Sequence, residues 1–203
     1  MPESAPPSSP VTASPEAARS SAAPTSIPAL SRAEVRELLF DLPWPELRAL
    51  AHQCRLRHKG RHVHVRGLLE FSNVCRRNCR YCGLRHENRH LARYSLSAAE
   101  LLRAASQAVA AGVDTLVLQS GETARNPLWL AQVVRGLKER FGLPVTLSVG
   151  EQPREWYALW REAGADRFLL KHETADARLY AALHPGYRLA DRLRALSWLA
   201  ELG

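Results

Sequence analysis

Three cysteines within eight residues constrain this chain more than any other feature of its sequence. Cys75, Cys79 and Cys82 stand in the spacing C-x3-C-x2-C. Thiolates so close together indicate a metal site, because cysteines are the ligands of structural zinc and of iron–sulfur clusters. A [4Fe–4S] cluster normally takes four cysteines, so a set of three would leave one iron open to another molecule.

The cysteine spacing also admits a zinc site. His86 would complete a C-x3-C-x2-C-x3-H set, which suits a closed tetrahedral zinc ion. The spacing alone leaves both metals open, and three unliganded core cysteines are the remaining alternative. Cys54 stands apart, and we expect it to be an ordinary buried or half-buried thiol. So few cysteines do not make a secreted disulfide framework, which favours a reducing, cytoplasmic compartment.

The length and composition are those of a globular protein. With 203 residues, of which 46% are hydrophobic, the chain can bury a sizeable core. No apolar run reaches the roughly 18 residues that span a bilayer, so we expect no membrane partner. The net charge of +8 comes mainly from arginines scattered over predicted helices, which indicates a solvated surface rather than a nucleic-acid partner. The basic stretches 58–66 and 76–93 form a candidate docking surface for an acidic partner.

The chain divides into three segments. Residues 1–27 consist mostly of Ala, Ser, Pro and Thr and are predicted to be a disordered tail, because they cannot bury enough apolar surface to fold. Residues 28–62 are predicted to hold N-terminal helices. Ser31 and Glu34 form a capping box that opens a helix over 32–40, and a second helix is predicted over about 44–57. Residues 63–203 are predicted to form the main domain.

Strands and helices alternate along the main domain. Short apolar strands are predicted at 63–71, 114–119, 145–149 and 167–171. The helices between and after them are predicted at 98–111, 127–141, 153–163, 176–183 and 189–201. Short apolar strands joined by helices favour a parallel sheet in an α/β fold. About four βα units are present, and both a doubly wound sheet and a (β/α) barrel fit this order.

Chemically useful side chains follow the ends of these strands. Cys75 follows the first strand, Ser120-Gly121-Glu122 the second, Glu151 the third and His172-Glu173-Thr174 the fourth. The carboxyl ends of parallel strands meet at one edge of a sheet, where ligands bind in such folds. The pattern therefore predicts one site that gathers residues from all four units.

Two of these motifs together resemble the radical S-adenosylmethionine (SAM) superfamily. The cysteine loop has Tyr81 just before its last cysteine, and Ser120-Gly121-Glu122 is similar to the superfamily's Gly-Gly-Glu motif. Four ordered blocks, at 71–85, 117–122, 147–151 and 169–175, are most similar to the HydE family of [FeFe]-hydrogenase maturases. The resemblance covers about 63–203 and implies a partial (β/α) TIM-type barrel behind the N-terminal helices. The methylornithine synthase and biotin synthase families are the alternatives within the superfamily.

The resemblance implies a radical SAM enzyme. Cys75, Cys79 and Cys82 would hold a [4Fe–4S] cluster whose fourth iron binds SAM. Reductive cleavage of SAM would give a 5′-deoxyadenosyl radical, used in assembly of the di-iron subcluster of [FeFe]-hydrogenase. Expected partners are a small-molecule or iron-complex substrate, a reductant such as a ferredoxin or flavodoxin, and other hydrogenase maturation proteins. No side chain is expected to be catalytic beyond the cluster and the cofactor.

The resemblance also implies which residues bind SAM. They are Tyr81, Gln119, Ser120, Gly121, Glu122, Glu173 and Arg192. Glu122 would accept the methionyl amino group, Glu173 the same group or a ribose hydroxyl, and Arg192 would pair with the methionyl carboxylate. The structural alternatives are that Glu122 and Glu173 cap the helices that follow them and that Arg192 is a surface charge.

The sequence departs from the family at three points. Lys171 stands where the family usually has Arg, and Thr123 where Asp is expected. The sequence stops at Leu202-Gly203, where a fifth strand should begin, so we expect a barrel that lacks its C-terminal half and leaves one sheet face without partners. A catalytically inactive remnant and a Cys3His zinc module that binds nucleic acid are therefore kept as alternatives.

Overall fold

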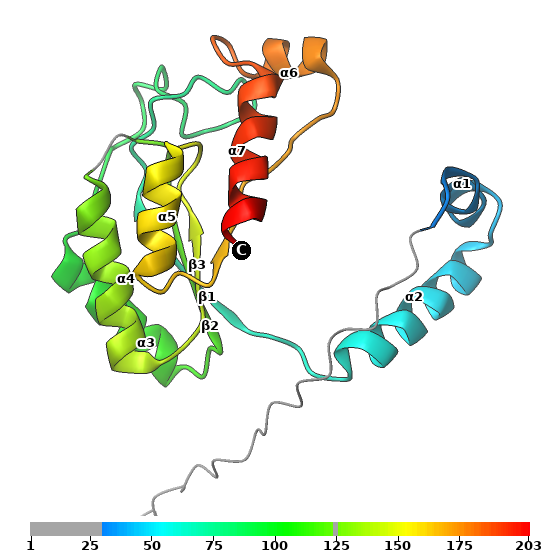
Figure 1. The fold of residues 1–203 in the computed structure, drawn as a ribbon, viewed down its shortest axis with the longest axis horizontal. Coiled ribbons are helices and arrows are strands. Elements are labelled where there is room, and N and C mark those ends of the chain that lie inside the picture. Colours follow the sequence, from blue (N-terminus) through cyan, green and yellow to red (C-terminus); the bar gives the residue numbers. More distant parts are fainter. Residues whose placement is uncertain (1–29, 124–125) are drawn as a thin grey trace, which may run out of the picture. The chain divides into compact units, whose positions relative to one another are not determined.

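The computed structural model describes residues 30–123 and 126–203 (Figure 1). The tail predicted at 1–27 lies outside these residues. The chain separates into two compact units, the first ending at His62 and the second running from Val63 to Gly203. None of the helices in the described part is long and apolar enough to cross a membrane.

The first unit contains helices α1 (Arg32–Phe40) and α2 (Trp44–Lys59). The predicted capping box opens α1, because Ser31 accepts from the backbone N–H of Glu34 and the Glu34 side chain returns to the backbone of Ser31. Neither helix buries a residue. The residues that concern the candidate site all belong to the second unit.

Four parallel strands form the centre of the second unit. They are β1 (Arg66–Ser72), β2 (Thr115–Ser120), β3 (Val145–Ser148) and β4 (Arg167–Phe168). Each strand pairs with the one before it, so the order in the sheet is the order in the chain. A sheet in chain order has no switch point, which favours the barrel type over the doubly wound type.

Helices pack along one face of this sheet. They are α3 (Ala98–Ala110), α4 (Pro127–Phe141), α5 (Arg154–Glu162) and α7 (Leu189–Leu202), and they contact one another in that order (Figure 1). The ends of α4 are as predicted, with Asn126 as the N-cap, Pro127 in the first turn and Gly142 in the left-handed conformation. The short helix α6 (Ala177–Leu183) precedes α7.

The strands bury one face and expose the other. In β1 the burial alternates, so that Leu69 and Phe71 are buried against the helices, while Leu68 is 54% exposed. The neighbouring pairs Leu68–Val117 and Glu70–Gln119 therefore share the face that has no helical cover. This is the arrangement expected of a partial barrel, in which the face without helical cover is the inner one.

The fourth strand is shorter than predicted. A strand was expected over 167–171, but the ladder with β3 ends at Phe168, and only the N–H of Leu169 continues it by donating to the carbonyl of Leu147 at 2.8 Å. The chain then leaves the sheet, and the carbonyl of Lys171 accepts from Arg192 instead. The strand has a partner on one edge only, so nothing in the described chain holds its last residues in the ladder.

Substitution of Ser97 by alanine should weaken the fold measurably. The Ser97 hydroxyl caps α3 by accepting from the backbone N–H of Glu100, and the Glu100 side chain accepts from the backbone N–H of Ser97. We expect Ser97→Ala to lower the free energy of unfolding by about 1 kcal/mol, measured by urea denaturation. Ser106→Ala is the control, because this hydroxyl only donates to the carbonyl of Leu102 within the same helix. Equal losses in the two variants would contradict a capping role.

Candidate functional site

The three cysteines lie in the loop that follows β1. All three are half-buried, and the backbone N–H of Cys82 donates to the carbonyl of Cys79 at 3.0 Å. Burial raises the pKa of the Cys79 thiol, and Cys75 and Cys82 raise it further, while the Arg77 guanidinium lowers it. The thiols are thus close enough to influence one another, as ligands of one metal centre would be.

The donor set of the loop bears on the two metals that the sequence left open. Three half-buried cysteines on one loop fit a [4Fe–4S] cluster with one open iron, whereas a closed tetrahedral zinc site needs a fourth side-chain ligand. His86, the candidate fourth zinc ligand, is exposed.

The end of β2 presses directly on the cysteine loop. A Cβ added to Gly121 would lie 2.4 Å from the carbonyl oxygen of Val74 and 2.8 Å from the Cβ of Cys75. Two backbone hydrogen bonds hold the segments together, from Gly121 to Ser72 at 3.1 Å and from Arg76 to Glu122 at 2.8 Å. The glycine of the motif is therefore required by close backbone approach to a cysteine ligand.

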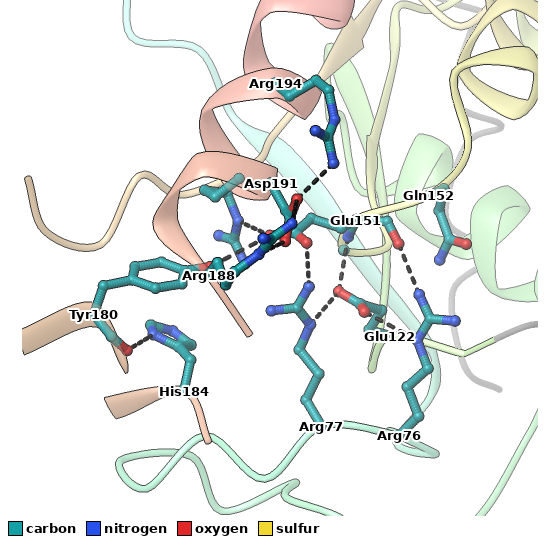
Figure 2. Close-up of polar contacts among 12 residues, drawn as sticks. Arg76, Arg77, Glu122, Glu151, Gln152, Tyr180, His184, Arg188, Asp191 and Arg194 are labelled. Carbon is teal, nitrogen blue, oxygen red and sulfur yellow. Dashed lines mark hydrogen bonds and ion pairs between the residues drawn. The ribbon is translucent and has the colours of Figure 1, made fainter. Parts of the chain in front are cut away.

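Glu122 lies at the centre of a buried ion network (Figure 2). Its side chain is 4% exposed and contacts Nε of Arg76 at 3.0 Å and Nε of Arg77 at 2.6 Å. It also accepts the backbone N–H of Glu151 at 2.8 Å. Gly150 confines it further, since a Cβ there would lie 2.4 Å from Oε2 of Glu122.

Glu151 extends the network to the last helices. Nη2 of Arg77 lies 2.5 Å from its carboxylate, and the Tyr180 hydroxyl donates to the same group at 3.3 Å. Arg192 of α7, which is 5% exposed, forms an ion pair with Glu151 and donates to the carbonyl of Lys171. The network thus joins the ends of three strands to α7.

Arg77 is the most deeply placed charge of the site. Its side chain is 3% exposed, and its guanidinium lies 3.7 Å from the ring centroid of Tyr187. Burial lowers the pKa of Arg77, but the carboxylates of Glu122 and Glu151 raise it more, so the group stays charged. No sequence pattern distinguishes this residue from the other arginines of the loop.

Glu122 and Arg192 belong to one ion network. Neither has the purely structural role considered as the alternative, which was a helix cap for Glu122 and a surface charge for Arg192. Asn126, not Glu122, caps α4, and Asp176, not Glu173, caps α6. Arg192 is buried rather than on the surface.

Glu173 and Tyr81 lie near each other at the edge of the site. Glu173 has φ 69°, the only positive φ among the non-glycine residues that the structure describes, and such a backbone costs about 1–3 kcal/mol. Burial raises the pKa of Tyr81, and Cys79 and Glu173 raise it further. Strained backbone beside a metal-ligand loop is common at binding sites.

Gln119 and Ser120 lie at the end of β2. The Gln119 amide donates to Glu70 at 3.4 Å on the exposed sheet face, and the Ser120 hydroxyl donates to the carbonyl of Gly121 at 2.8 Å. Thr123 and Lys171, two positions where the sequence departs from the family, take part here through their backbone carbonyls. The Thr123 carbonyl accepts from the Gln152 side-chain amide, and the Lys171 carbonyl accepts from the Arg192 guanidinium.

The C-terminal end of α6 and the turn after it support the cysteine loop from a second side, which no sequence pattern predicted. The backbone N–H of Arg80 donates to the carbonyl of Leu183 at 3.0 Å. His184 is fully buried, with Nε2 2.8 Å from the Tyr81 hydroxyl and Nδ1 3.0 Å from the carbonyl of Tyr180. Burial lowers the pKa of His184, which favours the neutral imidazole.

Comparison with known proteins identifies the family. The model of the radical SAM superfamily matches residues 69–203. The chain belongs to the radical SAM superfamily. Its members use a [4Fe–4S] cluster and SAM, which agrees with the cofactors expected for the cysteine loop.

Two curated relatives are similar to large parts of the chain. The [FeFe] hydrogenase maturase subunit HydE of Thermotoga maritima is 48% identical over 157 residues, which are 76% of this chain and 44% of that protein. A 3-methylornithine synthase of Methanosarcina acetivorans is 29% identical over 180 residues, 86% of this chain and 51% of that protein. The chain therefore spans about half the length of these relatives.

Solved radical SAM structures share the fold. The structure of methylornithine synthase (PylB) superimposes on this chain with a TM-score of 0.75 at 27% sequence identity. The matched part is 86% of this chain and 53% of the PylB chain. The hydrogenase maturase HydG of Carboxydothermus hydrogenoformans has a TM-score of 0.76 at 22% identity, over 86% of this chain and 43% of its own. The predicted partial (β/α) barrel is thus confirmed.

A methyl group at Gly121 should disturb the cysteine loop. Gly121→Ala would place its Cβ against the backbone of Val74, so we expect the free energy of unfolding to fall by about 1–3 kcal/mol and less iron to bind on reconstitution. Gly83→Ala, directly after Cys82, is the matched control, because a Cβ there meets nothing within 4 Å. If both variants load iron like the parent, the close approach does not constrain the site.

Removal of Arg77 should cost far more than removal of Arg76. Arg77→Met leaves Glu122 and Glu151 buried without their shared cation, and we expect a loss of about 3–5 kcal/mol in urea denaturation of the cluster-free protein. Arg76→Met is the control, because its side chain is 46% exposed and contacts the same Glu122. We expect this variant to lose about 1 kcal/mol or less. A comparable loss in both would show that burial does not set the strength of the network.

Proposed function

We propose that this chain is a radical SAM enzyme that cleaves SAM reductively in the assembly of the di-iron subcluster of [FeFe]-hydrogenase. One observation carries the proposal: the cysteine loop and the adjoining strand-end motifs form one site in a chain that is 48% identical to HydE over 157 residues. The cysteines require a reducing environment to stay free thiols, so the proposal places the reaction in the cytoplasm.

Cys75, Cys79 and Cys82 would hold the cluster, and the fourth iron would be left for SAM. The chemistry that a bound, reduced cluster would supply is transfer of one electron to the sulfonium of SAM, with cleavage of the C5′–S bond to methionine and a 5′-deoxyadenosyl radical. The chain's own residues bind and orient the cofactors and exclude water, since no side chain near the cysteines is required as an acid or a base.

The charge of the network suits the zwitterionic end of SAM. Among the ion pairs of the residues that the structure describes, three arginines share two carboxylates, so one positive charge is left over. The arginines are Arg76, Arg77 and Arg192, and the carboxylates are those of Glu122 and Glu151. We propose that Arg192 uses this charge to bind the methionyl carboxylate.

The amino group of SAM needs an acceptor nearby. Glu122 would supply it by giving up Arg76, the one ionic partner whose side chain reaches solvent. Its contact with the buried Arg77 would remain. The exposed carboxylate of Glu173 would contact the same amino group or a ribose hydroxyl, beside Tyr81 at the adenine.

The substrate would be a small molecule or an iron complex, bound over the exposed face of the sheet, where Gln119 lies. The electron would come from a ferredoxin or flavodoxin, and other hydrogenase maturation proteins would act before or after this step. A second candidate is a radical SAM enzyme of the methylornithine synthase type, which is favoured by the TM-score of 0.75 with PylB.

Anaerobic reconstitution tests the metal. We expect about four irons and four sulfides per chain, loss of both in Cys79→Ser, and no loss in Cys54→Ser, whose thiol is exposed and lies in the first unit. His86→Ala should keep its iron. One zinc without sulfide, lost on His86→Ala, would refute the proposal in favour of the zinc module.

Product analysis tests the reaction. The reconstituted chain with dithionite and SAM should release 5′-deoxyadenosine, and Arg192→Met should raise the Kd for SAM at least about tenfold, because a charge-assisted contact is lost. Addition of the chain to a hydrogenase maturation assay that lacks HydE distinguishes the two candidates. Release of 5′-deoxyadenosine without restored hydrogenase would favour the methylornithine synthase type, and a bound cluster without any product would favour an inactive remnant.

A further inference from the structure

The cysteine loop carries a concentrated positive charge. Residues 75–93 contain six arginines and a single acidic residue, Glu87. We define the cysteine-loop face as the exposed basic side chains of this stretch, which are Arg76, Arg80, His86, Arg89, His90 and Arg93. These residues lie between and after the three cysteines in the chain, and His86, Arg89 and Arg93 line a cavity together with Cys75.

This face is neutralised only in part, because Arg76 pairs with Glu122 while other arginines of the face have no such partner within the described part of the chain. Among the ion pairs of the described residues, none involves Arg80 or Arg89. Arg93 donates only to backbone carbonyls, including those of Asn73 and Leu84, so it stiffens the loop and keeps its charge. Glu87, the one acid, accepts from the amide of Asn78.

A cavity opens on this face beside a cluster ligand. Its volume is about 420 Å³, and Cys75, His86, Arg89 and Arg93 are among the residues that line it. Cys75 is half-buried. A group of a partner protein that entered the cavity would therefore come against a cysteine ligand of the cluster while basic side chains surrounded it.

We propose, on the basis of the function proposed above, that the cysteine-loop face docks an acidic one-electron carrier protein that reduces the cluster. The carrier gives up one electron and the cluster passes from the 2+ to the 1+ state, with no atom or proton transferred. Carboxylates of the carrier complement the unpaired arginines and steer the encounter, which raises the association rate. The cavity brings the donor group close to Cys75, which shortens the path of the electron.

The cavity favours an electron carrier over nucleic acid. A nucleic-acid surface would need aromatic side chains for stacking beside its arginines. Residues 75–93 contain one Phe, Tyr or Trp, Tyr81, whose hydroxyl contacts His184 and whose ring packs edge-on with the same imidazole. A basic cavity beside a cluster ligand would bring an acidic electron carrier close to the irons that it reduces.

Binding of an FMN-loaded acidic flavodoxin tests the proposal. The double variant Arg80→Glu/Arg89→Glu should weaken binding to the reconstituted chain by at least about tenfold at low ionic strength, mostly through slower association. The matched control is Arg103→Glu/Arg135→Glu, which changes the net charge equally with exposed residues of α3 and α4. We expect it to stay within about twofold of the parent, and salt should weaken the binding of the parent.

Two further measurements separate this proposal from the proposed function. Stopped-flow reduction of the cluster by reduced flavodoxin should slow by at least about tenfold in the Arg80/Arg89 variant, whereas the 5′-deoxyadenosine formed with excess dithionite should not change. Equal weakening in the control variant, or none in either, would overturn the docking surface. Loss of binding to a single-stranded RNA oligonucleotide in the Arg80/Arg89 variant, with flavodoxin binding intact, would overturn it in favour of nucleic acid. Absence of 5′-deoxyadenosine with dithionite would refute the proposed enzyme activity. The flavodoxin-binding result would still decide whether the docking surface exists.

Discussion

Burial of the Arg77 guanidinium between Glu122 and Glu151 is the interaction that organises this site. Arg77 follows the end of β1, Glu122 the end of β2 and Glu151 the end of β3. A buried ion that loses its partner costs several kcal/mol, so none of the three loops can move away alone. Glu151 passes the constraint on to Arg192, and α7 is thereby fixed to the same point.

This network places the cysteines by holding the residues between and beside them. Arg77 lies between Cys75 and Cys79 in the chain, so fixing its side chain limits the conformations of the ligand loop. On the other side the α6–α7 turn holds the loop through Arg80 and Tyr81. A loop supported from two sides presents its thiolates in a preformed arrangement, which lowers the ordering cost of taking up a cluster.

Local signals in the sequence predicted the fold and part of the site. Capping boxes, Asn126 and Gly142 marked helix ends correctly, because those interactions involve residues close in sequence. The strand ends were predicted well enough to bring Cys75, Glu122 and Glu151 to one edge. The role of Arg77 and the contact of His184 with Tyr81 could not be predicted, because their partners lie far away in the chain and nothing in the local pattern marks a buried charge or a buried imidazole. The length of β4 was overestimated for a related reason, since its end depends on what pairs with it.

Gly121 precedes Glu122 in the chain, and Gly150 lies against the Glu122 side chain. Both positions are too crowded for a side chain, which limits the substitutions that the sequence can accept. Neither glycine can acquire a side chain while the carboxylate stays in place, because the added atom would overlap the ligand loop in one case and Glu122 itself in the other. Gly121 is therefore held by the cysteine loop whether or not the acid is present, whereas the crowding at Gly150 depends on Glu122 alone. A lineage that loses the acid would leave Gly150 constrained only by its left-handed backbone, with φ 77°, so a change at that position would record the loss.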